Sequence, residues 1–252
     1  MTKAPRIIGS IFLKDEIVVQ SYYFNKFLPI GKLSKSIEYL NEWGVDEILI
    51  LNINGKKIDL NVLENAIKIC NIPICYGGGV DSIDYAKNLI NIGIDKISLN
   101  SLVLTSFEKV REITNYFGSQ FVTVSVNIKK YNNKYYIYDY KKKKILNDDI
   151  FSFIKRLNDI PVGEILLNFV DKDGSKAGLD IACFKKIVTS VDLPILISGG
   201  SGDFNQILNF CKKNNVVPVI GNIFNHTENP VPNLKKLFLT KYKEIRLNRF
   251  FK

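Results

Sequence analysis

Two glycine-rich turns are the residues of this sequence best suited to binding chemistry. The first turn lies in Cys75–Val80, which reads CYGGGV, and the second lies in Ile197–Gly202, which reads ISGGSG. Each turn follows a short apolar run with a proline near its start and precedes a segment with helical spacing. Glycine lets backbone N–H groups approach an anion closely, and a following helix N-terminus adds a favourable dipole. One such turn would indicate only a strand-to-helix connection, but two turns half a chain apart predict two phosphate-sized anion sites.

Small polar residues follow the next strand-like run after each turn. Asn100 and Ser101 come after the first turn, and Gly221 and Asn222 come after the second. With the backbone amides of the glycine turns, we expect these residues to hold two phosphates on opposite sides of one site. The predicted ligand is therefore a small molecule with a phosphate at each end.

The elements that must position these residues alternate between strand and helix along the chain. Near-continuous apolar runs predict strands at 6–13, 47–53, 72–76, 96–99, 122–128, 164–169, 194–198 and 216–220. Helical spacing predicts helices at 34–43, 60–70, 82–92, 106–117, 149–158, 180–190 and 203–214, and a last one within 232–243. Strict alternation predicts a parallel sheet, and this many strand–helix units in 252 residues favour a closed (β/α)8 TIM barrel.

The barrel is expected to form a single domain over residues 1–252 with a half-barrel internal repeat. Asp46–Leu49 resembles Gly163–Leu166, and the glycine turns recur at nearly the same offset from these segments. Residues 22–32 are expected to form an aromatic loop that contains glycine. A polar, lysine-containing insert at about 129–147 is expected to form a small hairpin.

The composition limits the kinds of partner and compartment. No apolar run is long enough to cross a membrane, and the segment 1–6 lacks the apolar core of a signal peptide, so we expect a cytoplasmic protein that binds no membrane. The four cysteines form no CxxC pair and His226 is the only histidine, so we expect no metal, no cofactor and buried reduced thiols. The net charge of +10 is concentrated in Lys141–Lys144 and in the tail from Lys235 to Lys252. The tyrosines and asparagines around 131–140 do not repeat the phosphate-plus-stacking pattern of a nucleic-acid platform, and an anionic substrate or an acidic partner protein accounts equally well for the basic charge, so we expect no nucleic-acid partner.

Acid–base chemistry would require titratable side chains at the C-terminal ends of the strands, where barrels of this class carry their active sites. The first and fifth strands end in Phe12 and Asn127, which carry no proton near neutral pH. Asp171 and Asp173 are the carboxylates near this mouth, and turn formation or helix capping explains them equally well. His226 follows the last strand, and we assign it no catalytic role.

Four charged residues stand at the starts of strands, which form the floor of a barrel. They are Arg6, Glu47, Lys96 and Glu164. Pointing inward, they would form a ring of two positive and two negative charges, and buried charges persist only when they are paired. Such a ring would be either a plug that closes the floor or a gate on a path along the barrel axis.

The chain resembles the cyclase subunit of imidazole glycerol phosphate synthase over nearly its whole length. The segments that carry this resemblance are Arg6–Ile8, Gly77–Val80, Lys96–Ser101, Phe117–Gln120, Gly163–Leu167, Asp171–Gly174, Gly178–Asp180 and Ser198–Gly202. The resemblance implies a heterodimer in which a partner glutaminase makes ammonia at the floor. The ammonia then crosses the barrel to a bis-phosphorylated substrate.

The resemblance also implies roles for individual residues. It makes Arg6, Glu47, Lys96 and Glu164 the ammonia gate of the family. It places phosphate-binding residues in two groups, which are Gly79, Asn100 and Ser101 on one side, and Asp173, Gly174, Gly200, Gly221 and Asn222 on the other. Neutral ammonia needs a dry path, and we expect the Ile, Leu and Val of the strands to supply an apolar bore.

Departures from the family pattern change the expected function. The family's general acid and base are two aspartates, and Phe12 and Asn127 stand at these positions here, while Asn52 replaces a third aspartate and Gln20 replaces a lysine. Loss of both members of an acid–base pair costs several orders of magnitude in rate. The chain is therefore more similar to paralogues from surface-polysaccharide biosynthesis, in which the barrel supplies ammonia to a separate sugar amidotransferase. It would then be the non-glutaminase subunit of a glutamine-dependent amidotransferase or lyase complex.

Two other readings stay open at this point. In the first, the chain is an active cyclase of histidine biosynthesis, and Asp171 or Asp173 takes over proton transfer. In the second, it is a non-catalytic module that senses phosphorylated metabolites.

Overall fold

The structure is a computed structural model that describes residues 4–214 and 216–246. The first three residues and the end of the basic tail to Lys252 lie outside the described residues. Expectations about these segments therefore have no structural counterpart.

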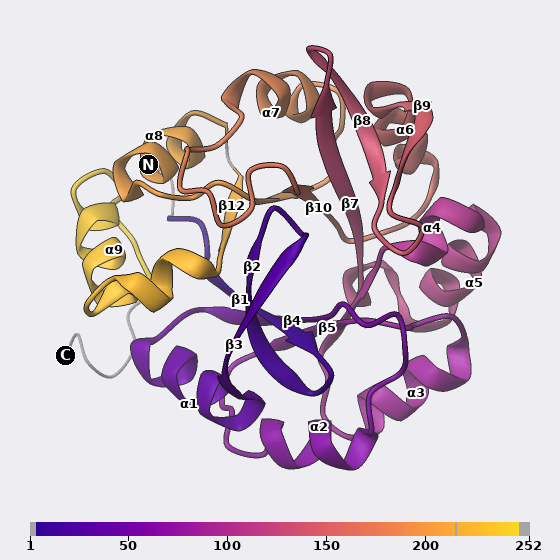
Figure 1. The fold of residues 1–252 in the computed structure, drawn as a ribbon, viewed down its shortest axis with the longest axis horizontal. Coiled ribbons are helices and arrows are strands. Elements are labelled where there is room, and N and C mark those ends of the chain that lie inside the picture. Colours follow the sequence, from indigo (N-terminus) through magenta and orange to yellow (C-terminus); the bar gives the residue numbers. More distant parts are fainter. Residues whose placement is uncertain (1–3, 215, 247–252) are drawn as a thin grey trace.

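Eight parallel strands of the described chain close into a barrel with helices around it (Figure 1). In pairing order they are β1 (Ile8–Lys14), β4 (Glu47–Asn52), β5 (Ile74–Gly77), β6 (Lys96–Leu99), β7 (Val122–Tyr131), β10 (Glu164–Phe169), β11 (Ile195–Ser198) and β12 (Val217–Ile220). The circle closes because β12 pairs with β1, and β7 pairs directly with β10. The predicted (β/α)8 TIM barrel is confirmed.

Helices form the outer layer of the barrel. They are α1 (Leu33–Trp43), α2 (Leu60–Ile67), α3 (Ile83–Asn91), α4 (Ser101–Thr105), α5 (Phe107–Phe117), α6 (Ile150–Arg156), α7 (Ile181–Val188), α8 (Phe204–Asn214) and α9 (Pro230–Leu239), with 3₁₀ turns η1 (Ser119–Phe121), η2 (Leu157–Asp159) and η3 (Asn222–His226). Several begin at a side-chain cap, as where Ser82 accepts the amide of Tyr85 and Asp180 accepts that of Cys183. These caps fix where a helix starts and thus the length of each loop at the barrel mouth.

Alternation along the strands divides their side chains between two cores. Ile7, Ile11 and Leu13 of the first strand region pack outward against the helices in the main hydrophobic core. A smaller cluster fills the barrel interior, and its buried members are Ile8, Leu49, Cys75, Leu166, Leu196 and Val219. Most of the aliphatic side chains therefore hold the helices on the sheet and do not line the barrel axis.

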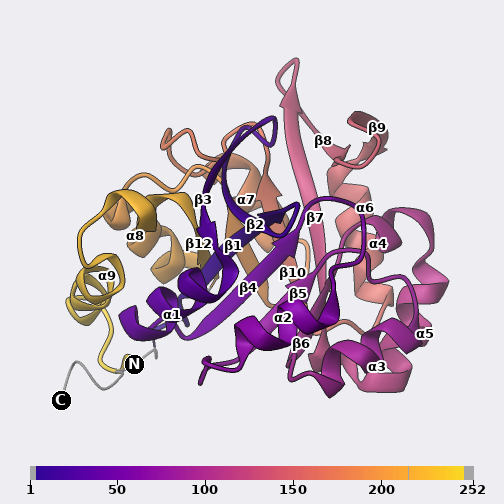
Figure 2. The ribbon, with the colours of Figure 1, turned by 60° about the horizontal axis from the view of Figure 1, so that its bottom comes forward.

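Two hairpins extend the sheet beyond the barrel and project from the same end of it (Figure 2). In the predicted insert, β7 forms a hairpin with β8 (Lys134–Asp139), and β9 (Lys144–Asp149) adds a third strand. The other hairpin joins β2 (Ile17–Tyr22) to β3 (Lys26–Lys32), so the loop expected at 22–32 is wrong. Pro29 and Gly31 are typical of loops, so the sequence did not indicate β3. Both residues are nevertheless tolerated in an edge strand, and nearly all of β3 is exposed.

Candidate functional site

The four charged residues of the barrel floor form one closed group of ion pairs, here called the floor quartet (Arg6, Glu47, Lys96 and Glu164). Arg6 Nε lies 3.3 Å from Glu47 Oε2, and Lys96 Nζ lies 3.1 Å from the same oxygen. Lys96 Nζ also lies 3.3 Å from Glu164 Oε2, and the Arg6 guanidinium donates to the other oxygen of Glu164. Each cation therefore contacts both carboxylates, and charges of opposite sign alternate around the ring.

Burial of the floor quartet makes its pairing necessary. Burial raises the pKa of Glu47, although Arg6 and Lys96 act in the opposite direction. Thr123 Oγ1 lies 3.5 Å from Glu164 Oε2 and is the polar neighbour above the quartet. A buried carboxylate in this position stays ionised only while a cation remains beside it, and Arg6 and Lys96 each contact both carboxylates.

The interior of the barrel above the floor quartet has one apolar wall and one polar wall. Side chains two positions apart on a strand share a face, so Ser125 and Asn127 of β7 face the barrel interior, as Thr123 does. On the neighbouring strand β6, Ser98 is buried and its hydroxyl has no hydrogen-bond partner. The expectation of a wholly apolar bore is wrong on this side. Opposite it, the interior cluster around Ile8, Leu49 and Leu196 supplies the apolar wall.

An apolar cluster lies across the mouth of the barrel, here called the mouth cluster. Its members are Phe12, Val19, Phe24 and Val170, which are buried, and Phe27, Leu51, Ile53, Tyr138 and Tyr140, which are partly buried. Leu51 belongs to β4 and Val170 directly follows β10, and these two strands stand opposite each other in the circle of eight. The cluster therefore spans the mouth and fills its centre.

Phe12 and Asn127 occupy the predicted acid–base positions in different ways. The Phe12 ring packs edge-on against Phe24, with ring centroids 5.2 Å apart, as part of the mouth cluster. Asn127 is buried, and its side-chain oxygen accepts a hydrogen bond of 3.3 Å from Asn168. Neither residue supplies a proton donor or acceptor that titrates near neutral pH.

The second glycine turn and its predicted partners line one pocket at the mouth, here called the second cradle. Its lining includes all five residues predicted for this side, which are Asp173, Gly174, Gly200, Gly221 and Asn222. Sequence reasoning missed Ser10 and Lys176, which also line it. Lys176 was not predictable because it lies in the loop after β10, where no periodic pattern places a side chain.

Backbone geometry at the second cradle requires glycine. Gly199 has a φ of +96°, and a Cβ there would lie 2.9 Å from the backbone nitrogen of Phe169. The β2–β3 hairpin closes over the cradle, because Asn222 Nδ2 donates to the carbonyl of Ser21 at 2.5 Å and the amide of Tyr23 donates to the carbonyl of Asp173 at 2.8 Å. These contacts engage polar groups of the second cradle, so a phosphate in this pocket would have to displace the hairpin or share these groups with it.

The two candidate carboxylates of the mouth have different surroundings. Burial raises the pKa of Asp173 to about 7, and its Oδ2 atom is buried without a hydrogen-bond partner in a pocket wall. Asp171 instead accepts the amide of Lys130 at 3.2 Å, and burial raises its pKa as well. Asp173 thus lies in the second cradle, whereas Asp171 fastens the insert hairpin to the loop after β10.

The residues of the predicted first phosphate site lie on two paired strands. Gly79 follows β5, and Asn100 and Ser101 follow β6, its hydrogen-bonded neighbour. The Asn100 amide donates to the carbonyl of Ser125 at 2.7 Å, so it is already engaged. Lys57 lies against Gly79 and forms an ion pair of 2.9 Å with Asp81. This side therefore brings the expected residues to one edge and adds a cation that sequence reasoning missed.

Three other predicted positions have structural contacts. Asn52 Nδ2 donates to the carbonyl of Lys56 at 3.0 Å and so shapes the loop after β4. Gln20 Nε2 lies 2.5 Å from His226 Nε2 and 2.9 Å from the hydroxyl of Tyr22. Among the described residues, no group of three or more His, Cys, Asp or Glu side chains is arranged to hold a metal ion, and no helix is long and apolar enough to span a membrane.

These observations define the class of protein, which is a (β/α)8 barrel with a charged quartet at its floor and glycine turns at its mouth. A family model described as "Histidine biosynthesis protein" matches residues 6–229. The chain is 34% identical to a Vibrio vulnificus (strain YJ016) protein provisionally named imidazole glycerol phosphate synthase subunit hisF2, over 88% of this chain and 84% of that protein. It is 29% identical to imidazole glycerol phosphate synthase subunit HisF of Sulfurisphaera tokodaii, over 97% of this chain and 99% of that protein. The chain therefore belongs to the histidine biosynthesis protein family.

Proposed function

We propose that this chain is a cyclase-like synthase subunit that docks a glutaminase at its floor and passes ammonia lengthwise through the barrel, with little or no cyclase activity of its own. One combination of features carries the proposal. The floor quartet is complete and closed, while an apolar cluster containing Phe12 replaces the acid–base site at the other end. A complete floor quartet without an acid–base pair at the mouth fits a protein that delivers ammonia to another enzyme.

The floor quartet has the chemistry of a gate. Its two cations are partly exposed, with side-chain exposures of 19% for both Arg6 and Lys96, whereas Glu47 is nearly buried. Lysine carries its charge on a flexible stem, so Lys96 can leave the ring while Arg6 stays in contact with both carboxylates. An ammonia molecule that passes this point would then meet the hydroxyl of Thr123, which can accept or donate a hydrogen bond.

The proposed acceptor of the ammonia is a sugar in surface-polysaccharide biosynthesis, converted by a separate sugar amidotransferase. The support for this part is the absence of a titratable side chain at either acid–base position, Phe12 or Asn127, together with similarity to relatives named hisF2 and hisF3. A cytoplasmic heterodimer with the glutaminase is the corresponding assembly.

The test is an assay of the purified complex with its matching glutaminase, with an active cyclase subunit as the positive control. We expect glutamine hydrolysis without formation of imidazole glycerol phosphate. Replacing Lys96 with methionine should change the rate of ammonia delivery to the acceptor enzyme while leaving glutamine hydrolysis in place. Substantial imidazole glycerol phosphate formation would overturn the proposal.

A second candidate function is an active cyclase, which one observation favours. Asp173 is a buried carboxyl at the second cradle with a pKa of about 7, so it can exchange a proton near neutral pH. Rescue of a histidine-requiring strain that lacks its own cyclase would establish this function. Failure of well-expressed protein to rescue that strain would remove it.

A third candidate is a sensor of phosphorylated metabolites without a glutaminase partner. The second cradle supports ligand binding but says nothing about nitrogen transfer. Co-purification separates the candidates, because a stable glutaminase complex is expected for ammonia delivery and not for a sensor.

A further inference from the structure

Exposed apolar side chains gather on the β2–β3 hairpin at the mouth of the barrel. Ile17, Tyr23, Leu28 and Ile30 are each at least 40% exposed. Eleven large apolar side chains of the described residues are exposed, and this one hairpin carries four of them. Apolar residues that are exposed singly are ordinary, but a group of them on one element marks a contact surface.

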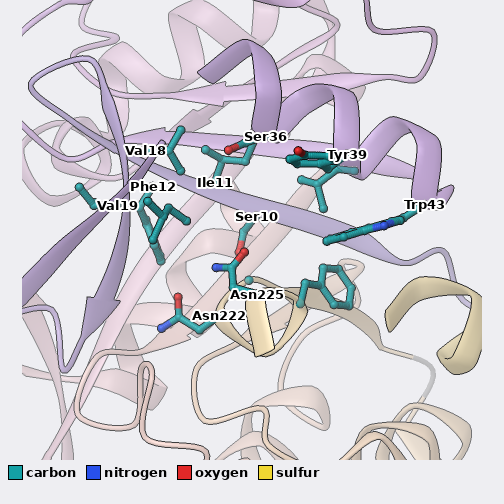
Figure 3. Close-up of a pocket in the computed structure, with 14 residues that line it drawn as sticks. Ser10, Ile11, Phe12, Val18, Val19, Ser36, Tyr39, Trp43, Asn222 and Asn225 are labelled. Atoms are coloured by element: carbon teal, nitrogen blue, oxygen red, sulfur yellow. The ribbon is translucent and has the colours of Figure 1, made fainter. Parts of the chain in front are cut away.

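A β-bulge directs Ile30 to a pocket beside the hairpin. The pairing of β2 with β3 shifts register between Val18 and Val19, and Ile30 is left without a partner on β2. Bulges commonly re-aim one side chain in this way. Ile30 lines a pocket between β1, the β2–β3 hairpin, α1 and η3, here called the aromatic pocket (Figure 3).

The aromatic pocket is suited to receive one apolar side chain from another protein. Tyr39 and Trp43 project from α1 into it, and their rings stack with centroids 5.9 Å apart. Phe224 of η3 packs edge-on against Trp43, with centroids 6.5 Å apart. Tyr39 is 54% exposed, so its ring can be reached from outside. Pockets of this kind receive the anchor residues that carry most of the binding energy of a protein interface.

The aromatic pocket touches the closure of the barrel mouth. Phe12 lines the pocket and also belongs to the mouth cluster, which fills the centre of the mouth. Ammonia that leaves the barrel at this end must therefore pass the segments that form the cluster. In bulk water near neutral pH ammonia takes up a proton and ceases to be a nucleophile, so the enzyme that accepts it has to dock at this end.

Lysines surround this surface and select the charge of a partner. Lys26 and Lys32 stand exposed at the two ends of β3. The exposed run Lys141–Lys144 lies beside the hairpin, because the neighbouring Tyr140 packs against Phe24 and Phe27. Residues 14–32 and 129–149 together contain ten lysines and five carboxylates. A surface with this excess of positive charge favours an acidic partner.

The free edge of β3 is not the point of contact. Among the described strands β3 pairs with β2 alone. Pro29 lacks a backbone donor, and lysines stand at both ends of the strand, which are features that prevent another strand from adding to an edge. A partner is therefore expected to bind through side chains.

We propose that the outer face of the β2–β3 hairpin, the aromatic pocket and the lysines around them form the docking surface for the ammonia-accepting enzyme. That enzyme presents an apolar side chain to the aromatic pocket and acidic residues to Lys26 and Lys32. This inference rests on the proposed ammonia delivery and adds the surface through which the accepting partner binds.

The test measures binding of the purified full chain to the purified sugar amidotransferase of the same organism, by calorimetry. Ile30→Asp should weaken binding about tenfold or more, because it replaces an anchor contact by a charge that repels an acidic partner. Ile69→Asp is the matched control, since Ile69 is also 45% exposed but lies between α2 and β5, at the floor end of the barrel. Tyr39→Ala removes a wall of the pocket without adding charge and should also weaken binding about tenfold.

A second pair of variants tests the charges. Lys26→Glu combined with Lys32→Glu should slow association about tenfold and make binding less sensitive to salt, because charges at the rim of an interface act mainly on the association rate. Lys109→Glu combined with Lys185→Glu makes the same change of net charge on α5 and α7 and should have a much smaller effect.

The outcomes separate this inference from the proposed function. Equal binding by the Ile30→Asp and Ile69→Asp proteins would overturn the docking surface, while ammonia delivery is still judged by the glutaminase complex. Sedimentation of the full chain alone tests another occupant, because a dimer that Ile30→Asp dissociates would mean that a second copy covers this surface. Failure of the unaltered chain to bind the amidotransferase would also overturn the inference, and absence of ammonia delivery in the same complex would remove the proposed function with it.

Discussion

Two side chains at the mouth, Asn127 and Phe12, depart in different ways from the acid–base pair that the family resemblance implies. Asn127 keeps the size of a carboxylate and accepts a hydrogen bond from Asn168, so its neighbours are undisturbed. Phe12 fills the space with a ring that packs on Phe24. Asn127 cannot exchange a proton near neutral pH. Phe12 cannot either, and its ring also occupies space that a substrate would need. Under the proposed function, conversion to an active cyclase would therefore require changes in several residues of the mouth cluster.

Asp173 makes a prediction about pH at the residue scale. Burial raises its pKa from 3.8 to about 7 in the folded protein, so folding favours the protonated carboxyl. The stabilisation of the folded state by protonated Asp173 is fully present below pH 3.8, the pKa of this carboxyl in the unfolded chain, and is lost as the pH rises towards 7. We expect Asp173→Asn to become relatively more stable than the original chain over this window, by up to ~1.4 kcal/mol per pH unit. Urea unfolding at several pH values measures this difference.

The same titration should affect phosphate binding. Above pH 7 an ionised Asp173 would repel a phosphate in the second cradle, so binding should weaken as the pH rises, and Asp173→Asn should remove that part of the pH dependence. For the stability prediction, free energies of unfolding of the original chain and of Asp173→Asn that change in parallel from about pH 4 to 7 would contradict the raised pKa of Asp173.

At the scale of elements, the β2–β3 hairpin lies tightly over the second cradle. Gly174 has a φ of +69°, and a Cβ there would meet the carbonyl of Ser21 and would lie 2.8 Å from Asn222 Nδ2. Gly174→Ala should therefore destabilise the fold by about 2–4 kcal/mol, since left-handed strain and overpacking add. Thermal or urea unfolding measures the loss.

Gly55 offers a control with the same backbone conformation. Its φ is +72°, and the nearest contact of an added Cβ is Lys141 Cε at 3.9 Å. Gly55→Ala should cost only the left-handed strain of about 1–2 kcal/mol. Equal losses in the two variants would mean that the hairpin does not pack on Gly174.

The two hairpins hold each other through aromatic contacts. Tyr140, in the turn between β8 and β9, packs edge-on against Phe24 and Phe27 at centroid distances of 5.4 and 6.4 Å. Tyr140→Ala should release both hairpins, with amide exchange about tenfold faster across 17–32 and 139–144, because each aromatic pair stabilises by roughly 1 kcal/mol. Hydrogen exchange detected by mass spectrometry resolves the two segments.

Tyr131→Ala is the comparison for this experiment. Tyr131 is 57% exposed at the end of β7 and takes no part in the mouth cluster. Its removal should leave exchange in 17–32 unchanged. Faster exchange there in both variants would indicate general loosening instead of a specific contact between hairpins.

Elements differ in how far the sequence could predict them. Helices with a side-chain cap and an apolar stripe, such as Ile83–Asn91 after Ser82, could be located from local chemistry. The strand β3 could not, because its Pro29 and Gly31 suit a loop equally well and its stability depends on pairing with β2. The apolar content of β7 predicted an apolar interior, but side chains alternate along a strand. Val124 and Val126 therefore face the helices, and the polar residues between them face the barrel interior.

At the scale of the whole molecule, closure of the barrel determines what can meet. The floor quartet was predictable because Glu47, Lys96 and Glu164 start strands and Arg6 lies just before one, and strand starts share one end of a parallel barrel. The mouth cluster was not predictable, because Phe12 lies on β1 while Phe24 and Tyr140 lie in the turns of two hairpins, and the sequence does not fix where these turns meet.

Lys235 connects the last helix to the barrel floor. It is only 1% exposed, and its Nζ donates to Asp46 Oδ1 at 3.1 Å and to the carbonyl of Arg246 at 2.7 Å. Lys235→Met should destabilise the fold by about 3 kcal/mol, because it leaves a buried carboxylate without its cation. The exposed neighbour Lys236, changed to methionine, should alter stability by no more than about 0.5 kcal/mol. Similar unfolding midpoints for the two variants would contradict a structural ion pair.

The backbone amide of Ala4 donates to the carbonyl of Glu244 at 2.8 Å, next to the strand starts that carry the floor quartet. An affinity tag or fluorophore attached near either of these residues would therefore stand where, under the proposed function, a glutaminase would approach. The turn at Asn132–Asn133 projects from the opposite end of the barrel (Figure 2). Immobilising the protein through that turn would leave the floor accessible to an incoming subunit in a surface-based binding measurement.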